Sequence, residues 1–259
     1  MNQSSTSNFS VRSIPPPDPR TSEDCLFLDV IAPQALFDAR DEGYGAPVLV
    51  WIYGGGYTEG SKSEDGNPAT LLARAKDNNA TGIVHVAINY RLGLFGWLSG
   101  PTFQMNATAN LGLYDQELAL RWIQENISKF GGDPNRITVI GDSAGGGSIM
   151  HQITAYGGLK GKYASVVAKK NIPSLEELRN LTLTQLYEIN YAIVGLSQYG
   201  TFTFGPTVDE RFAPRLPGEL ILHGQYDQSL RVLVGHNADE CAFLSSPFIL
   251  NDTTFVALC

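Results

Sequence analysis

The segment Ile137-Thr-Val-Ile-Gly-Asp-Ser-Ala-Gly-Gly-Gly-Ser148 predicts a strand that turns sharply into a helix. Its first four residues are β-branched and favour a buried strand. The pattern G-x-S-x-G follows at once, and its two glycines allow strand and helix to approach closely around a strained turn. Such a turn exposes the Ser143 hydroxyl and directs the backbone N–H of Ala144 towards the same point. Ser143 is therefore a candidate nucleophile. A glycine-rich turn without chemistry is the alternative, because the pentapeptide alone is only moderately specific.

Two buried strands are predicted upstream of this turn. Pro47 to Tyr53 is a continuous apolar run, the pattern of a strand that is covered on both faces. Ile83 to Ile88 is a second predicted buried strand, and His85 in its middle is interpreted as a core or edge histidine rather than a catalytic one. The first run stops at Gly54-Gly-Gly56, where three glycines can point several backbone N–H groups at one place; a flexible loop is the alternative. A further strand is predicted over Leu26 to Ile31, and a short helix over Pro68 to Lys76.

Helices separate the predicted strands. Leu113 to Phe130 is the clearest helix, because apolar residues recur on one face of a 3.6-residue period, at Leu120, Ile123, Ile127 and Phe130. Asp133 to Asn135 predicts a turn into the strand before Ser143, and Ser148 to Ile153 is compatible with the helix after it. The alternation predicts an α/β fold with a mostly parallel central sheet flanked by helices on both faces. Ligands are expected at the carboxyl ends of its strands.

The two ends of the sequence have weaker patterns. Residues 1–21 are rich in Ser, Asn and Pro and predict a disordered lead-in, so we expect one domain over residues 22–259. Ser174 to Glu177 is a capping box that opens a predicted helix, which Leu183 to Asn190 continues. Arg231 to Gly235 predicts a last short strand.

Composition excludes several classes of partner. The 259 residues have a formal net charge of −8 at pH 7, so they would be repelled by the phosphates of nucleic acid and by an anionic membrane surface. No apolar run is long enough to be a transmembrane segment, and the first residues do not form a signal peptide. Seven Asn-x-Ser/Thr sequons nevertheless favour a secreted glycoprotein, whereas three cysteines do not decide the compartment.

Motifs occur along most of the sequence. They are Ser22-Glu-Asp-Cys-Leu-Phe-Leu-Asp-Val30, Val50-Trp-Ile-Tyr-Gly-Gly-Gly-Tyr57, Asn89-Tyr-Arg-Leu-Gly-Leu-Phe-Gly96, Asn110-Leu-Gly-Leu-Tyr-Asp-Gln116, Phe130-Gly-Gly-Asp-Pro134 and the run from Gly141 to Ser148. In these residues and in their order the sequence resembles the type B carboxylesterase/lipase family, which includes cholinesterases and fungal extracellular lipases, and it is most similar to fungal members. The resemblance implies an α/β-hydrolase fold that is incomplete here, with an internal deletion and a missing C-terminal part.

The resemblance also implies a reaction, the hydrolysis of esters by a Ser–Glu–His triad without cofactor or metal. Ser143 matches the nucleophile, and the backbone N–H groups of Gly55, Gly56 and Ala144 match the oxyanion hole. Glu240 matches the acidic member of the triad. The implied partner is a small-molecule or lipid ester.

The sequence departs from the family pattern at the histidine of the triad. In the family this histidine follows the acid, and no histidine follows Glu240 here. His151, His223 and His236 all precede Glu240, against the order Ser, acid, His of this fold, so no catalytic histidine is identified. Two other hypotheses therefore stay open. The first is a catalytically inactive, truncated or mis-spliced member, and the second is a cholinesterase-like adhesion or binding module, which the intact nucleophile motif disfavours.

Overall fold

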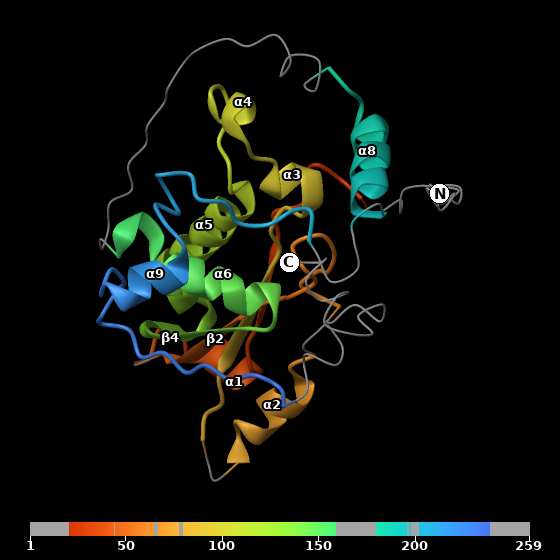
Figure 1. The fold of residues 1–259 in the computed structure, drawn as a ribbon. Coiled ribbons are helices and arrows are strands. Elements are labelled where there is room, and N and C mark those ends of the chain that lie inside the picture. The colour runs from red at the N-terminus through yellow and green to blue at the C-terminus, as the bar shows by residue number, and fades with distance from the viewer. Residues whose placement is uncertain are drawn as a thin grey trace, which may run out of the picture.

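A computed structural model describes residues 21–43, 45–64, 67–77, 80–158, 180–195, 197 and 202–238. These residues form a four-stranded sheet with helices around it (Figure 1). In chain order the elements are β1 (Leu28–Ile31), α1 (Gln34–Asp38), β2 (Ala46–Ile52), α2 (Ala69–Arg74), β3 (Val84–Ile88), α3 (Gly93–Trp97), α4 (Pro101–Gln104), α5 (Leu111–Asn126), η2 (Ile127–Phe130), β4 (Gly132–Gly141), α6 (Ala144–Ile153), η3 (Ala155–Gly157), α8 (Leu183–Gly195) and α9 (Pro217–Leu222).

The strands lie in the order β1-β3-β2-β4. The strand β2 pairs in parallel with β3 on one side and with β4 on the other, so that Val50 lies opposite both Val86 and Val139. At the edge, β1 pairs with β3 in the antiparallel direction. The prediction of a mostly parallel sheet is confirmed. Its physical basis is that β2 is apolar along its length and β3 at every position except His85, which suits strands inside a parallel sheet.

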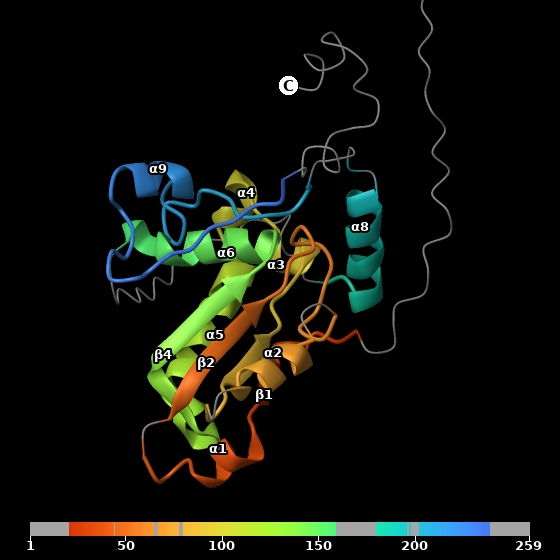
Figure 2. The ribbon, with the colours of Figure 1, turned by 90° about the horizontal axis from the view of Figure 1, so that it is seen from below.

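The two faces of the sheet are covered differently. Side chains alternate along β2, and Val48 and Ile52 share a buried core with Ile123 of α5. Helix α5 runs along this face of the sheet (Figure 2). On the opposite face His85 of β3 is 3% exposed, whereas Ile140 of β4 is 38% exposed. Among the described residues, the prediction of a sheet covered on both faces is therefore correct for β3, whereas β4 has one face exposed.

Most predicted elements occur with shifted ends. The predicted helix over Leu113 to Phe130 is present as α5 followed by η2, and Ile123 and Ile127 of its apolar face are 0% exposed. The predicted turn at Asp133 lies inside β4. The register of β4 against β2 shifts there, and the Asn135 N–H donates to the Asp133 carboxylate at 2.8 Å. The turn is thus a bulge within the strand.

The prediction of a strand at Arg231 to Gly235 is wrong. Residues 231–237 form no helix or strand, and the side chain of Leu233 is 99% exposed. A strand exists only where a neighbour supplies backbone hydrogen bonds, which a short apolar run does not determine. The helix predicted over Leu183 to Asn190 is confirmed by α8. The capping box at Ser174, the lead-in up to residue 20 and the chain from residue 239 lie outside the described residues.

None of the described helices has the length and apolar character needed to cross a membrane. The described His, Cys, Asp and Glu side chains form no group of three that could hold a metal ion. Cys25 is a free thiol whose pKa is raised, chiefly by burial.

Candidate active site

Ser143 occupies the turn between β4 and α6. It is exposed, and its backbone has φ 51° and ψ −118°, a conformation that non-glycine residues rarely adopt. A Cβ on Gly145 would lie 2.1 Å from the carbonyl oxygen of Ile52, and a Cβ on Gly141 would lie 2.5 Å from the carbonyl carbon of Gly145. Strand and helix therefore meet at a distance that only glycine allows. This close packing holds the Ser143 side chain in solvent at the carboxyl end of β4.

The segment Gly54–Gly56 begins where β2 ends. Gly55 has φ 90° and Gly56 has φ 57°, both in the left-handed region that favours glycine. The N–H groups of Thr58 and Glu59 donate to the carbonyl of Gly55 at 3.0 and 3.1 Å. A Cβ on Gly55 would lie 2.3 Å from the Glu59 carbonyl oxygen. The segment is therefore a tight turn closed by its own hydrogen bonds, which we call the glycine loop.

The glycine loop and the Ser143 turn lie side by side because β2 and β4 are neighbouring parallel strands. Ile52 stands opposite Gly141 in the ladder, so both strands end at the same edge of the sheet. A Cβ on Gly54 would lie 3.1 Å from the Cβ of Ser143. Ala144, whose N–H is the third predicted oxyanion donor, is the buried first residue of α6. Residues from two separate motifs thus meet at the carboxyl edge of the sheet, where parallel sheets bind ligands.

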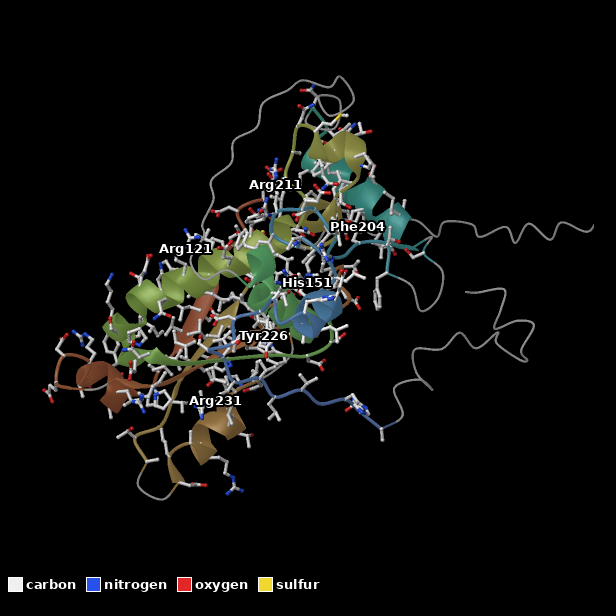
Figure 3. All side chains as sticks on the ribbon, turned by 60° about the vertical axis from the view of Figure 1, so that its left-hand side comes forward. Arg121, His151, Phe204, Arg211, Tyr226 and Arg231 are labelled. Carbon is white, nitrogen blue, oxygen red and sulfur yellow. The ribbon has the colours of Figure 1, made fainter. Side chains whose placement is uncertain are left out.

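The described residues do not assemble the acid and the base of the predicted triad. Glu240 lies outside them. The pKa values of His85 in β3, which is buried, and of His151 in α6 (Figure 3), which is partly buried, are both lowered by desolvation, and the pKa of His151 falls to about 4. His223 and His236 are exposed, and the Nδ1 of each donates to a backbone carbonyl at 2.8 Å. In the described part of the chain no hydrogen bond joins Ser143 to a histidine.

A buried polar cluster behind the Ser143 turn is not among the predicted site residues. Gln116 of α5 and Ser148 of α6 are both 0% exposed, and the Gln116 Nε2 donates to the Ser148 Oγ at 2.9 Å. Gln152 donates to the Leu113 carbonyl at 2.9 Å. The sequence did contain a signal, because Gln116 falls at helical spacing between Leu113 and Leu120 on the apolar face of α5. A polar residue on such a face indicates a buried group that needs a hydrogen-bond partner.

Two other polar contacts hold α5 in place. The Arg91 guanidinium donates through two nitrogens to the carboxylate of Asp115, at 2.8 and 2.6 Å, and Asp115 is 5% exposed. Asn110 precedes α5 with φ 57°, and its side chain pairs with both the N–H and the carbonyl of Thr207 at 2.8 Å. The Asn110 amide also donates to Asp209 at 2.9 Å. The helix that carries Gln116 is therefore fixed at its N-terminal half.

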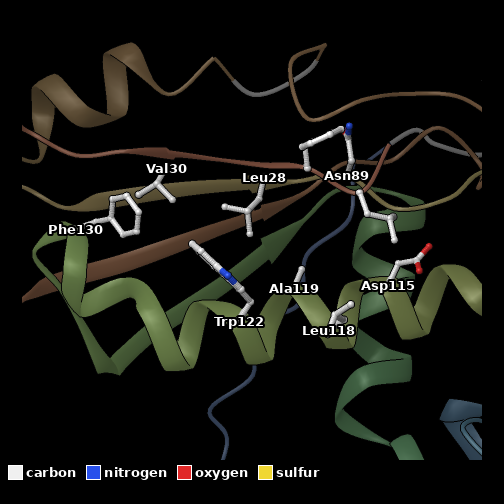
Figure 4. A pocket seen from close by; sticks show the side chains of 10 residues that line it. Leu28, Val30, Asn89, Asp115, Leu118, Ala119, Trp122 and Phe130 are labelled. Carbon is white, nitrogen blue, oxygen red and sulfur yellow. The ribbon is translucent and has the colours of Figure 1, made fainter. Parts of the chain in front are cut away.

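An open pocket of about 450 Å³ lies between β1 and α5 (Figure 4). Its lining is mostly apolar, with Leu28, Trp122 and Phe130 along it and Asn89 and Asp115 at one end. No residue of the Ser143 turn or of the glycine loop lines this pocket. It is therefore distinct from the candidate active site.

Comparisons with known proteins identify the family. A sequence model described as the Carboxylesterase family matches residues 1–169. The chain is 42% identical over 275 residues to carboxylesterase patB of Penicillium expansum, covering 94% of this chain and 49% of that protein. It is 31% identical over 272 residues to a secreted lipase of Arthroderma benhamiae, covering 91% and 50%. Among solved structures, a PNB esterase matches with a TM-score of 0.70 and 31% identity, over 91% of this chain and 53% of that one.

The chain spans about half the length of these relatives, whose shares are 49%, 50% and 53%. The family and the fold that the motifs predicted are both confirmed by these matches. The mostly parallel sheet has a serine on the turn after β4, and the similarity extends across nine tenths of the chain. The chain therefore belongs to the carboxylesterase family and has a partial α/β-hydrolase fold.

Proposed function

We propose that the protein hydrolyses carboxylic esters through an acyl-enzyme formed on Ser143. The observation that supports this most directly is the exposed Ser143 in a left-handed backbone conformation beside the glycine loop. A side chain held in a strained conformation by close packing is typical of a functional site. Family membership points to the same chemistry, because two of its relatives are named carboxylesterase and lipase.

The proposed mechanism uses the arrangement at the sheet edge. The Ser143 Oγ attacks the ester carbonyl, and the negative charge that develops on the oxygen is stabilised by the N–H groups of Gly55, Gly56 and Ala144. Each donor of this kind contributes about 10²–10³ in rate. The tetrahedral intermediate then expels the alcohol, which leaves the acyl group on Ser143, and water releases the acid. The proposed substrate is a small-molecule or lipid ester.

Proton transfer in this mechanism needs a histidine oriented by Glu240. None of the residues after Glu240 is a histidine, and the histidines within the described residues are not bonded to Ser143. Removal of the histidine from such a triad lowers kcat by on the order of 10⁶. We therefore expect these 259 residues alone to be acylated or phosphonylated slowly, with turnover restored when a histidine is supplied in the family's position. A chain without any reactivity is the competing proposal.

The test is covalent labelling of Ser143. The folded chain, verified by far-UV circular dichroism, is incubated with a fluorophosphonate, and the adduct is located by peptide mass spectrometry. We expect one adduct, on Ser143, that disappears in Ser143→Ala and persists in Ser128→Ala, a control at an exposed serine on η2. A folded chain with no adduct, or an adduct that persists in Ser143→Ala, would contradict the proposal.

We also propose that the protein enters the secretory pathway. The Arthroderma benhamiae relative is named a secreted lipase, and the sequence has seven sequons, of which the one at Asn180 is exposed. Expression in a secreting yeast should give a product whose mobility increases on endoglycosidase treatment and whose shift decreases in Asn180→Gln. A product without any glycosidase-sensitive shift would argue against this location.

A further inference from the structure

Tyr57 connects the glycine loop to the rest of the site. It directly follows Gly56 and has φ 63°, and its carbonyl accepts a hydrogen bond from the Gly93 N–H at 2.8 Å. Its ring packs against Trp97, with ring centroids 4.5 Å apart. Burial raises the pKa of the Tyr57 hydroxyl to about 12, and the neighbouring side chain of Ser148 acts in the opposite direction. The hydroxyl therefore stays protonated beside α6.

The helix α6 leaves room for this hydroxyl at Gly147. A Cβ on Gly147 would lie 2.6 Å from the hydroxyl oxygen of Tyr57, which is shorter than the roughly 3.3 Å at which carbon and oxygen make favourable contacts. Gly147 lies one helical turn after Ser143, and its N–H donates to the Ser143 carbonyl at 2.9 Å. The hydroxyl thus reaches the turn of α6 that begins at the candidate nucleophile.

Ser148, whose side chain neighbours the Tyr57 hydroxyl, is itself fixed. Ser148 is completely buried, and its Oγ accepts the hydrogen bond from Gln116 of α5. Gln116 is also completely buried, and its amide oxygen lies 3.4 Å from the Nε2 of Gln152 on α6. A buried polar cluster of this kind is costly to break, because each group would lose its partner away from water. The cluster links the glycine loop, α6 and α5.

We propose that Tyr57 is a positioning residue that sets the distance between the oxyanion donors of the glycine loop and Ser143 by fitting its hydroxyl against Gly147 and Ser148. The loop is closed by its own hydrogen bonds from the N–H groups of residues 58 and 59 to the Gly55 carbonyl, and the Tyr57 side chain extends from it to α6 at Gly147. This proposal rests on the proposed function, since it concerns the position of the Gly55 and Gly56 N–H groups relative to the oxyanion that forms during ester hydrolysis. Donors misplaced by about 1 Å cost on the order of 10²-fold in rate.

The first experiment separates positioning from stability. Tyr57→Phe removes only the hydroxyl and retains the ring against Trp97. With a fluorophosphonate we expect the maximal rate of Ser143 labelling to fall by about tenfold or more, with little change in the concentration for half-maximal rate. Tyr156→Phe is the matched control, because it removes the hydroxyl of another half-buried tyrosine, which donates to Glu117 at 3.0 Å, and should leave labelling unchanged. An unaltered maximal rate in Tyr57→Phe would overturn the proposal.

The second experiment uses the contact at Gly147. In the wild-type background Gly147→Ala should lower both the midpoint of thermal unfolding and the labelling rate, because the methyl group overlaps the Tyr57 hydroxyl. In the Tyr57→Phe background the same change should leave the midpoint unchanged or raise it, because alanine is the better helix former. Equal effects in both backgrounds would show that the hydroxyl does not fit against this helix, and the proposal would fail.

Hydrogen exchange distinguishes failure of this proposal from failure of the proposed function. If folded wild-type chain is not labelled on Ser143, the proposed function fails, and exchange of the amides over residues 54–60 then decides the inference. We expect faster exchange in Tyr57→Phe than in wild type and in Tyr156→Phe. Identical exchange in all three would overturn the positioning role of Tyr57 whatever the labelling result.

Discussion

Gly145→Ala measures how far the Ser143 turn depends on close contact between α6 and β2. The new methyl carbon would lie 2.1 Å from the carbonyl oxygen of Ile52 and 2.9 Å from that of Tyr53. Both oxygens belong to the backbone at the end of the central strand, which cannot move aside as a flexible side chain can. Favourable carbon–oxygen contacts begin near 3.3 Å, so α6 must move away from β2 by roughly 1 Å.

This displacement should reduce both stability and reactivity. Overpacking in a close-packed interior costs about 1–3 kcal/mol, and the better helix propensity of alanine offsets up to about 1 kcal/mol of that. A net loss of about 1–2 kcal/mol corresponds to a fall of about 2–8 °C in the midpoint of thermal unfolding for a domain of this size. Because Ser143 moves with α6, phosphonylation should slow by on the order of 10²-fold.

The assay combines thermal unfolding, followed by far-UV circular dichroism, with fluorophosphonate labelling of the same sample. Gly218→Ala is the matched control, since Gly218 lies in α9 and a Cβ there would have nothing within 4 Å. We expect the control to match wild type or to unfold at a slightly higher temperature. If Gly145→Ala behaved like Gly218→Ala in both measurements, the account of a turn fixed by glycine-only packing would be refuted.

Three further predictions concern groups around α5 and α6. Arg91→Leu leaves the carboxylate of Asp115, which is 5% exposed, without its cation. The free energy of unfolding in urea should fall by about 3–5 kcal/mol and should recover substantially when Asp115→Leu is added. A double variant as unstable as Arg91→Leu would contradict the prediction. Since burial lowers the pKa of His151 from 6.5 to about 4, folding favours the neutral ring. The stability that the neutral His151 ring contributes is complete above about pH 6.5, and up to about 3 kcal/mol of it is lost as pH falls towards 4. The midpoint of urea unfolding should therefore fall less steeply with decreasing pH in His151→Gln than in wild type. Equal slopes in the two proteins would count against the prediction. Asn110→Ala removes the side-chain hydrogen bonds to Thr207 at a residue whose φ is 57°. It should lower the free energy of unfolding by about 1–3 kcal/mol and speed the proteolysis of residues 202–213. Asn110→Gly should show the same faster proteolysis if the lost hydrogen bonds are responsible.

Local patterns were sufficient for much of the fold. The mainly apolar runs predicted β2 and β3, and the helical period predicted α5. Both signals depend only on the spacing of apolar residues along the sequence, which shows which side chains face the core and which face water. The run Arg231 to Gly235 has similar composition but forms no strand. Its failure has a physical cause, since backbone pairing requires a neighbour that the run itself does not specify. The same limit explains why the exposure of Ile140, on a face of β4 that the described residues leave uncovered, could not be anticipated from the sequence.

The sequence by itself determined the family and the positions of the Ser143 turn and the glycine loop. These depend on short motifs whose glycines have a local backbone reason. Only the tertiary structure decided that Gly54 lies against Ser143, that Gln116 bonds to Ser148, and that the Tyr57 hydroxyl meets α6 at Gly147. Residues so far apart in the chain come together through the parallel pairing of β2 with β4 and the packing of α5 beneath them. Such long-range pairing depends on the whole core at once, and no local pattern contains it.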